Sequence, residues 1–190
     1  VTRIETAASF TESVEKLVDI ESIRSSSLRV AVDAMYGAGA GFLPQILSGG
    51  QLKVSEINSL PNPAFPGIVQ PEPIDSNLKQ LAVKVRDGKY HVGLALDGDA
   101  DRVGVIDEKG NYLSTLEVFT IIAHHLIKDR NQRGAIACTI TMSSMVDKLS
   151  KKYGVEVHRT PVGFKYVGPK MLETNAMIGG EESGGYAFRG

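Results

Sequence analysis

Cysteine and aromatic residues are scarce in this 190-residue chain, which has one cysteine, no tryptophan and 6% aromatic residues. A single cysteine excludes a framework of intrachain disulfides. Cys138 lies in a short apolar run, so we expect a buried core residue in a protein kept reduced. The cytoplasm is the default location for such a protein.

An excess of charge and long apolar runs are also missing. The formal net charge is −1 and the basic residues are scattered, which excludes the electrostatic footprint of a nucleic-acid or anionic-membrane protein. No apolar run is long enough to cross a bilayer, and residues 1–10 show no signal-peptide pattern. We therefore expect a soluble protein that binds neither nucleic acid nor membrane.

The chain does contain a regular alternation of strand-like and helix-like segments. Strands are expected at 28–32, 53–57, 91–96, 103–106, 112–113, 135–140, 155–159 and 176–179, and helices at 9–22, 42–47, 76–85, 116–128, 144–152 and 164–173. Residues 61–73 contain five prolines and predict an extended loop. The alternation predicts an α/β fold of two successive three-layer α/β/α domains, 1–113 and 114–190, with mixed, largely parallel sheets.

The most informative motif is D-G-D-A-D-R at 97–102, directly after an apolar run. Its carboxylates Asp97, Asp99 and Asp101 repel one another, and one like-charge pair at ~4 Å costs about 4 kcal/mol at an effective dielectric of ~20. Neither a strand nor a helix brings alternate side chains to one point, so they can converge only on a tight loop. Hard oxygen ligands favour magnesium, calcium or manganese. A solvated acidic turn is the alternative.

A calcium loop of the EF-hand type is a second alternative for this motif. Asp97, Asp99, Asp101 and Glu108 fall on loop positions one, three, five and twelve. The sixth position, where the sharp turn requires glycine, is Arg102, and the flanking segments are β-rich. These two mismatches disfavour the EF-hand interpretation.

Two further loops follow predicted strands, where ligands gather in open α/β sheets. Residues 179–185 place Glu181 and Ser183 between glycine pairs, and these side chains suit sugar hydroxyls. A flexible polar turn is the alternative for this segment. In residues 160–165, Gly163 marks a turn and Lys165 lies in the first turn of a helix, whose dipole favours anions. This lysine is therefore either solvated or held for an anionic ligand.

A glycine-rich turn at 37–41 follows a strand and precedes a helix, and Glu56 lies at about the separation of a ribose-binding acid. This arrangement raises a dinucleotide-binding oxidoreductase as an alternative. However, the spacing is G-x-G-x-G, and three residues separate the strand from the first glycine. The pattern is thus a weak match to the dinucleotide fingerprint.

Three segments together resemble the α-D-phosphohexomutase superfamily: G-L-A-L-D-G-D-A-D-R at 93–102, T-P-V-G-F-K at 160–165 and G-G-E-E-S-G-G at 179–185. Their order and spacing match the second and third domains of that family, and the resemblance covers nearly the whole chain. It implies a four-domain enzyme, a phosphoglucomutase with phosphomannomutase as a further activity, that interconverts hexose 1-phosphate and hexose 6-phosphate. A phosphoserine on the first domain donates its phosphoryl group to give a bisphosphate intermediate.

The resemblance also implies roles for individual residues. Asp97, Asp99 and Asp101 would hold Mg²⁺, with the phosphoserine oxygen as its remaining ligand, and Arg102 would add positive charge near the transferring group. The substrate-binding residues by the same carry-over are Glu181, Ser183, Gly163 and Lys165, although the role of the lysine varies among members.

The phosphoserine loop and the phosphate-binding fourth domain of that family do not occur in this sequence. We therefore expect a fragment that is inactive alone, with a hexose phosphate as substrate and the missing domains of its parent as partners. Glu182 favours the glucose and mannose enzymes, since the glucosamine enzymes tend toward Gln there. A phosphoglucosamine mutase, an oxidoreductase module and a non-catalytic sugar-phosphate or calcium-binding module remain open.

Overall fold

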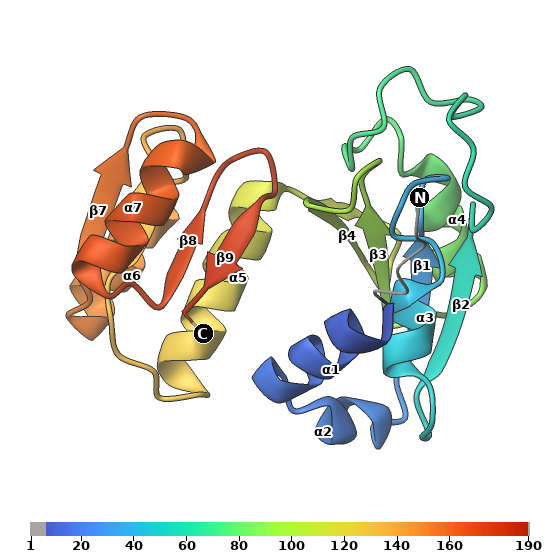
Figure 1. The fold of residues 1–190 in the computed structure, drawn as a ribbon, viewed down its shortest axis with the longest axis horizontal. Coiled ribbons are helices and arrows are strands. Elements are labelled where there is room, and N and C mark those ends of the chain that lie inside the picture. The colour runs from blue at the N-terminus through green and yellow to red at the C-terminus, as the bar shows by residue number, and fades with distance from the viewer. Residues whose placement is uncertain (1–6, 190) are drawn as a thin grey trace, which may run out of the picture. The chain divides into compact units, whose positions relative to one another are not determined.

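The computed structural model describes residues 7–189, which form two compact α/β units. One unit holds the residues up to Ala100 together with Val105–Tyr112, and the other holds Asp101–Gly104 together with the residues from Leu113 onward. Each unit is built on one sheet with helices on both faces (Figure 1). The predicted fold class, two α/β domains with mixed and mostly parallel sheets, is confirmed.

The first sheet has the strand order β2-β1-β3-β4-β5. Strand β1 lies between β2 and β3 and is parallel to both, so their carboxyl ends share one edge. The elements in chain order are α1 (Ala7–Leu17), α2 (Ile20–Arg24), β1 (Arg29–Asp33), α3 (Phe42–Leu47), β2 (Lys53–Ile57), α4 (Lys79–Asp87), β3 (Val92–Leu96), β4 (Val103–Asp107) and β5 (Tyr112–Leu113).

The core of this unit has a separate layer on each face of the sheet. Helix α4 packs Leu81 and Val85 against one face, while Ile46 and Leu47 of α3 pack against the other. Because both faces are covered, four successive residues of β1 are buried, as expected for a central parallel strand. The described residues 58–78 contain no helix or strand, so the extended loop predicted at 61–73 is confirmed, and α4 begins at Lys79, three residues after its predicted start at 76.

The second sheet has the strand order β7-β6-β8-β9, in which β6 is parallel to β7 and β8. The final strand β9 runs antiparallel beside β8 (Figure 1). The elements are α5 (Thr115–Lys128), β6 (Ile136–Thr139), α6 (Met145–Tyr153), β7 (Val157–Thr160), α7 (Phe164–Thr174), β8 (Ile178–Gly180) and β9 (Tyr186–Phe188). Phe119 of α5 and Val146 of α6 fill one side of the core, and Val167 and Met171 of α7 fill the other.

Local capping explains where the structure differs from the predicted elements. The single helix expected at 9–22 is wrong, because Asp19 begins a new helix by accepting a hydrogen bond from the Ser22 backbone N–H at 3.1 Å. Helix α5 begins at Thr115, one residue before its predicted start at 116, because Ser114 forms a capping box with Glu117. Strand β9 was not predicted, because three residues after a glycine pair carry no periodic signal.

Cys138 is completely buried in β6, as predicted, and burial raises the pKa of its thiol to about 11. Its thiol is therefore a core group. Within the described residues, no helix combines the length and apolar character that a membrane span requires. A cytoplasmic location remains a prediction.

Candidate functional site

The three predicted metal ligands converge on the loop that follows β3. Asp97 is fully buried, whereas Asp99 and Asp101 are exposed, and one oxygen of each lies within 4.8 Å of the others. At that separation a pair of unit charges repels by about 3.5 kcal/mol at an effective dielectric of ~20. A divalent cation removes this repulsion, and three carboxylates form the hard donor set that Mg²⁺ prefers. The residues of this loop therefore fit a magnesium ion.

The backbone of the acidic loop curls as the sequence requires, but the strained residue is Ala100. Its φ is 65°, in the left-handed region, and its N–H donates to the Asp97 carbonyl at 3.2 Å. Gly98 is needed for a different reason: a Cβ there would lie 3.0 Å from the Pro71 Cγ. The Gly98 N–H also donates to the Pro71 carbonyl at 3.1 Å. The proline-rich segment is thus one wall of the loop.

The glycine-rich turn at 37–41 forms a second support. The Ala38 N–H donates to the Gly98 carbonyl at 3.0 Å, and a Cβ on Gly37 would lie 2.6 Å from the same carbonyl oxygen. Glu56, the ribose acid of the dinucleotide alternative, instead accepts the Gly41 N–H at 3.1 Å. The glycines therefore permit close packing of this turn on the acidic loop.

Asp33 is a buried polar residue that the sequence analysis missed. It ends β1 with 1% of its surface exposed, and its Oδ1 accepts hydrogen bonds from the Met35 N–H and the Asn58 side-chain amide, both at 2.9 Å. Met35 and Tyr36 both have positive φ, so this carboxylate holds a strained turn beside the acidic loop. Burial raises the pKa of Asp33, and the two hydrogen bonds oppose that rise only in part.

Arg102, the predicted catalytic cation, follows the loop directly. Its Nε lies 3.6 Å from Asp101 Oδ1, and its side chain is 26% exposed. The guanidinium therefore stands beside the carboxylate cluster with part of its surface open to solvent. Such a group can stabilise negative charge that develops close to a metal ion.

In the second unit, the loop between β8 and β9 treats its two glutamates differently. Glu182 accepts hydrogen bonds from the hydroxyls of Thr139, at 2.9 Å, and Thr141, at 2.5 Å. Partial burial raises the pKa of Glu182, but hydrogen bonds from Thr141, its own backbone N–H and Thr139 outweigh that effect and lower it overall. Within the described residues, the buried Oε1 of Glu181 has no hydrogen-bond partner.

An unpartnered buried carboxylate oxygen is costly unless a ligand satisfies it. Glu181 therefore offers a free acceptor in the loop, and the neighbouring Ser183 is exposed. The loop backbone is fixed by the Glu181 N–H, which donates to the Gly185 carbonyl at 3.1 Å, and by Gly184, whose φ is 98°. Glu181 Oε1 can therefore accept a hydrogen bond from a ligand, and the Ser183 hydroxyl can donate or accept one.

The predicted turn at 160–165 ends β7 and begins α7 at the carboxyl edge of the same sheet. Gly163 has a φ of 124°, which favours glycine, and a Cβ on Gly185 would lie 3.9 Å from the Phe164 ring. The turn and the 181–185 loop are therefore neighbours. Lys165 is exposed, and its Nζ lies over the Tyr166 ring, 5.1 Å from the ring centre. It forms no ion pair with any described residue.

Arg159 is a second polar residue that the sequence analysis missed. From β7 its guanidinium donates to the carbonyls of Thr139, Met142 and Ser143 at 3.0–3.4 Å and to the Asp147 carboxylate at 2.9 Å. This network fixes the end of β6 and the segment after it, which carry Thr139 and Thr141, the two threonines bound to Glu182. No local pattern marks Arg159, because its partners lie 12–20 residues away.

The comparisons with known proteins agree with this architecture. Residues 8–110 match the family model described as phosphoglucomutase/phosphomannomutase, alpha/beta/alpha domain II, and residues 116–190 match domain III of the same family. A phosphoglucomutase/phosphomannomutase of Thermococcus kodakarensis is 37% identical over 94% of this chain and 39% of its own length. A Methanococcoides burtonii protein named "Probable phosphoglucosamine mutase" is 37% identical over 89% of this chain and 38% of its own length.

Solved structures show the same fold. A crystal structure of a phosphomannomutase candidate from Thermus thermophilus superposes with a TM-score of 0.91 at 32% identity, over 97% of this chain and 43% of that one. An Aspergillus fumigatus N-acetylphosphoglucosamine mutase in complex with GlcNAc-6P and magnesium has a TM-score of 0.66 at 16% identity, over 97% of this chain and 40% of that one. The chain spans about two fifths of the length of these relatives, and it belongs to the phosphoglucomutase/phosphomannomutase family through α/β/α domains II and III.

Proposed function

We propose that the parent of this chain is a phosphohexomutase that interconverts hexose 1-phosphate and hexose 6-phosphate through a phosphoserine and a bisphosphate. This chain supplies the magnesium loop and the sugar loop of that enzyme. The observation that carries the proposal is the convergence of the Asp97, Asp99 and Asp101 carboxylates within 4.8 Å on one short loop. Family membership and the magnesium complex of the Aspergillus fumigatus protein support it.

The three aspartates would hold Mg²⁺. When bound, the ion would supply positive charge to phosphate oxygens, and phosphoryl transfer depends mainly on positioning and electrostatic stabilisation. The guanidinium of Arg102 adds a second positive charge. Its Nε lies 3.6 Å from Asp101 Oδ1, which places this charge beside the three aspartates. A guanidinium remains charged throughout the physiological pH range, so it can bind phosphate oxygens at all times.

Glu181 and Ser183 would bind the sugar. The unsatisfied Oε1 of Glu181 accepts a sugar hydroxyl, and the exposed Ser183 hydroxyl can donate or accept. Gly163 shapes the adjoining turn, and Lys165 is the cation there that can meet an anionic substrate. The cation–π contact of Lys165 with Tyr166 accounts for the position of this side chain without a ligand.

Glucosamine 6-phosphate is a second candidate substrate. Several relatives at 33–38% identity are named as probable phosphoglucosamine mutases. The sequence argument against them relied on Glu182, whose carboxylate is bound by Thr139 and Thr141. A glutamine oxygen can accept the same hydrogen bonds. Residue 182 is thus explained by its threonine partners and carries little weight in choosing the sugar.

The first test is magnesium binding by the 190-residue chain, measured by calorimetry. Asp99→Asn removes one charged ligand and is expected to weaken binding at least about tenfold. Glu108→Gln removes the same charge outside the cluster, at the residue that the EF-hand alternative requires, and is expected to leave the affinity unchanged. Equal effects of the two variants would reject the three-aspartate site.

The second test concerns turnover and sugar binding. We expect the isolated chain to show no mutase activity with a hexose 1,6-bisphosphate primer, because its proposed partners, the phosphoserine and phosphate-binding domains, are supplied by the parent. In NMR titrations, glucose, mannose and glucosamine 6-phosphates are expected to shift the amides of residues 181–185. Ser183→Ala is expected to weaken those shifts. Substantial mutase turnover by the chain alone would contradict the proposal that the phosphoserine and phosphate-binding domains of the parent are needed for activity.

A further inference from the structure

A pocket with cationic walls lies in the first unit, at the opposite end of the strands from the acidic loop. It is open, has a volume of about 710 Å³, and is lined by Ser27, Arg29, Gly50, Gln51 and Lys53. Arg29 and Lys53 are the first residues of β1 and β2. Because β1, β2 and β3 are parallel, this is the amino edge of the sheet, whereas Asp97 follows the carboxyl end of β3. The pocket is therefore not part of the proposed mutase site.

The two cations of the pocket stand side by side. Arg29 and Lys53 are register partners on adjacent parallel strands, so their side chains leave the same face of the sheet, with the strands ~4.8 Å apart. Like charges at paired positions of a sheet are unfavourable. Among the described residues, neither side chain forms an ion pair with a carboxylate. Their charge is thus available to an anion from solution.

A third cation strengthens the local field. The Arg29 Cζ lies 4.9 Å from the centre of the Tyr90 ring, and the Lys84 Nζ lies 5.4 Å from the same point. A hydrogen bond with Ser55 and the charges of Lys84 and Arg29 lower the pKa of the Tyr90 hydroxyl, against the effect of burial. The ring also holds the guanidinium of Arg29 in place, which reduces the entropy lost when it binds a ligand.

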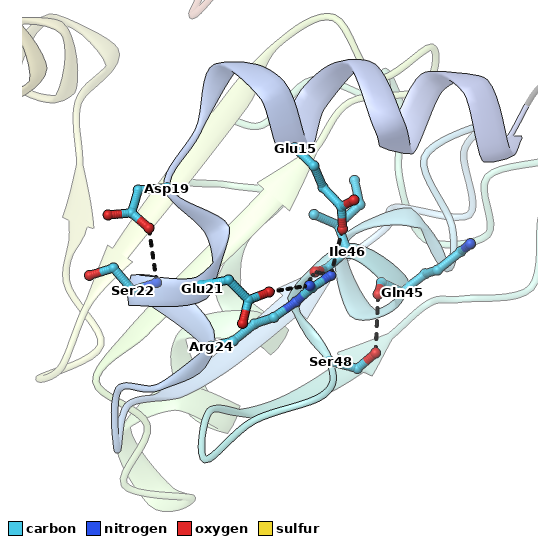
Figure 2. Close-up of polar contacts among 8 residues, drawn as sticks. All are labelled: Glu15, Asp19, Glu21, Ser22, Arg24, Gln45, Ile46 and Ser48. Carbon is cyan, nitrogen blue, oxygen red and sulfur yellow. Dashed lines mark hydrogen bonds and ion pairs between the residues drawn. The ribbon is translucent and has the colours of Figure 1, made fainter.

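The wall formed by Gly50 and Gln51 is held rigidly by Arg24. The Arg24 guanidinium is bonded to Glu15 of α1, to Glu21 of α2 and to the carbonyl of Ile46 in α3, as Figure 2 shows. Its own carbonyl accepts the Leu52 N–H at 3.0 Å, and a Cβ on Gly50 would lie 2.2 Å from that oxygen. The turn that lines the pocket is therefore packed in one position against the helical layer.

We propose that this pocket binds the phosphate group of a small phosphorylated metabolite. A phosphate monoester is an anion whose negative charge nearly balances the positive charge of two neighbouring cations. A guanidinium can donate hydrogen bonds to two phosphate oxygens at once. The Ser27 hydroxyl lines the same pocket and can donate a further hydrogen bond. A nucleic-acid strand is a poorer fit, because neutralising a run of phosphates needs more cations than the pocket supplies.

The test is an NMR titration of the intact 190-residue chain with inorganic phosphate at low ionic strength. We expect saturable shifts at the amides of Ser27, Gly50, Gln51 and Lys53. The double variant Arg29→Gln/Lys53→Gln is expected to weaken binding at least tenfold. A matched double variant, Lys128→Gln/Lys151→Gln, removes the same charge from exposed positions in the other unit and is expected to bind phosphate as the unmodified chain does.

Two further arms separate the possible results. Lys53→Gln alone keeps the contact between Arg29 and Tyr90, so it is expected to weaken binding without affecting the fold. Asp99→Asn is expected to leave phosphate binding at the pocket unchanged, so failure of the mutase proposal would not affect this one. Glucose 6-phosphate and AMP carry the same phosphate monoester on different sugars, and AMP adds a base. Tighter binding of one of them than of inorganic phosphate identifies the part of the ligand beyond the phosphate that the pocket contacts. Unsaturable shifts, equal loss in the matched control, or preference for a DNA oligonucleotide would overturn the proposal.

Discussion

The acidic loop at 97–102 and the proposed sugar loop at 181–185 both contain more than one carboxylate, but these carboxylates have opposite surroundings in the two loops. In the acidic loop, three carboxylates are brought within 4.8 Å of one another, an arrangement that a bound cation would stabilise. In the sugar loop, Glu182 is held by two threonine hydroxyls while Glu181 keeps a buried, unsatisfied oxygen. A carboxylate whose oxygens already accept hydrogen bonds from the protein, as in Glu182, holds the loop in place. A carboxylate without such donors, as in Glu181, keeps an oxygen that can accept from a ligand.

The largest expected effect comes from the support of the acidic loop. In Gly37→Ala the new Cβ would lie 2.6 Å from the Gly98 carbonyl oxygen and 2.9 Å from that of Asp97, so backbone must move. We expect a loss of about 3 kcal/mol in the free energy of unfolding and a weakening of magnesium binding. Urea denaturation and calorimetry measure the two effects.

The control for this change is Gly168→Ala in α7, where nothing beyond the chain neighbours and the helix's own backbone lies within 4 Å of the new methyl group. Alanine favours a helix over glycine by about 0.5–1 kcal/mol, but Pro169 follows directly and crowds the Cβ of the residue before it, so we expect a net change of less than about 1 kcal/mol in the free energy of unfolding. A loss in the control as large as in Gly37→Ala would show that the predicted contact is not the cause.

The anchor in the sugar loop ranks next. Glu182→Ala removes the carboxylate acceptor shared by the hydroxyls of Thr139 and Thr141 and leaves them only each other as partners, and we expect a loss of about 2 kcal/mol in unfolding free energy. Glu182→Gln keeps an oxygen acceptor and is expected to lose less than half as much. If both variants lost the same amount, the charge of Glu182 would matter more than its hydrogen bonds.

Acid is expected to affect Asp33 and Glu182 in opposite directions. The folded-state pKa of Glu182 lies below its usual 4.5, so it contributes stability above that pH and loses it as the pH falls through the folded-state value. The folded-state pKa of Asp33 lies above its usual 3.8, so its protonation adds stability as the pH falls through that raised value.

Urea midpoints measured between neutral pH and about pH 3.5 test this pair of signs. Glu182→Gln is expected to flatten the loss of stability on acidification, and Asp33→Asn is expected to make it steeper. A change of the same sign in both variants would contradict the assignment of Asp33 as a carboxylate whose charged form is disfavoured by burial.

The smallest effect is expected at Lys165. It is exposed and has only the Tyr166 ring beside it, so Lys165→Gln is expected to change the unfolding free energy by less than about 0.5 kcal/mol. Any larger consequence should appear in hexose phosphate binding. Titration of this variant therefore decides between the solvated and ligand-binding interpretations that the sequence leaves open.

The sequence predicts those parts of the site whose residues share one chemical role and lie close together in the chain. Asp97, Asp99 and Asp101 are close in sequence, so their convergence follows from the repulsion argument and the small residues between them. The order of strands and helices follows from periodicity in the same way, and it gives the α/β fold class correctly. Short-range capping by Asp19, which splits the first helix, depends on one side-chain rotamer and was missed.

The supports of the site depend on residues that are distant in the sequence. Thr139 and Glu182 are 43 residues apart, and Asp33 and Asn58 are 25 apart. An aspartate or threonine at the end of a strand is common in any α/β fold, so its type alone does not reveal its partner. These pairs become visible only when the parallel strands of each sheet are placed side by side.

The left-handed backbone of Ala100 has a consequence for the free energy of closing the acidic loop. Alanine in this conformation costs roughly 1 kcal/mol that glycine would avoid, yet it restricts the unfolded chain more than glycine does. The loop therefore surrenders less conformational entropy when it closes. Ala100→Gly would remove the backbone strain and enlarge the unfolded ensemble, so its two effects on the free energy of closing the loop oppose each other.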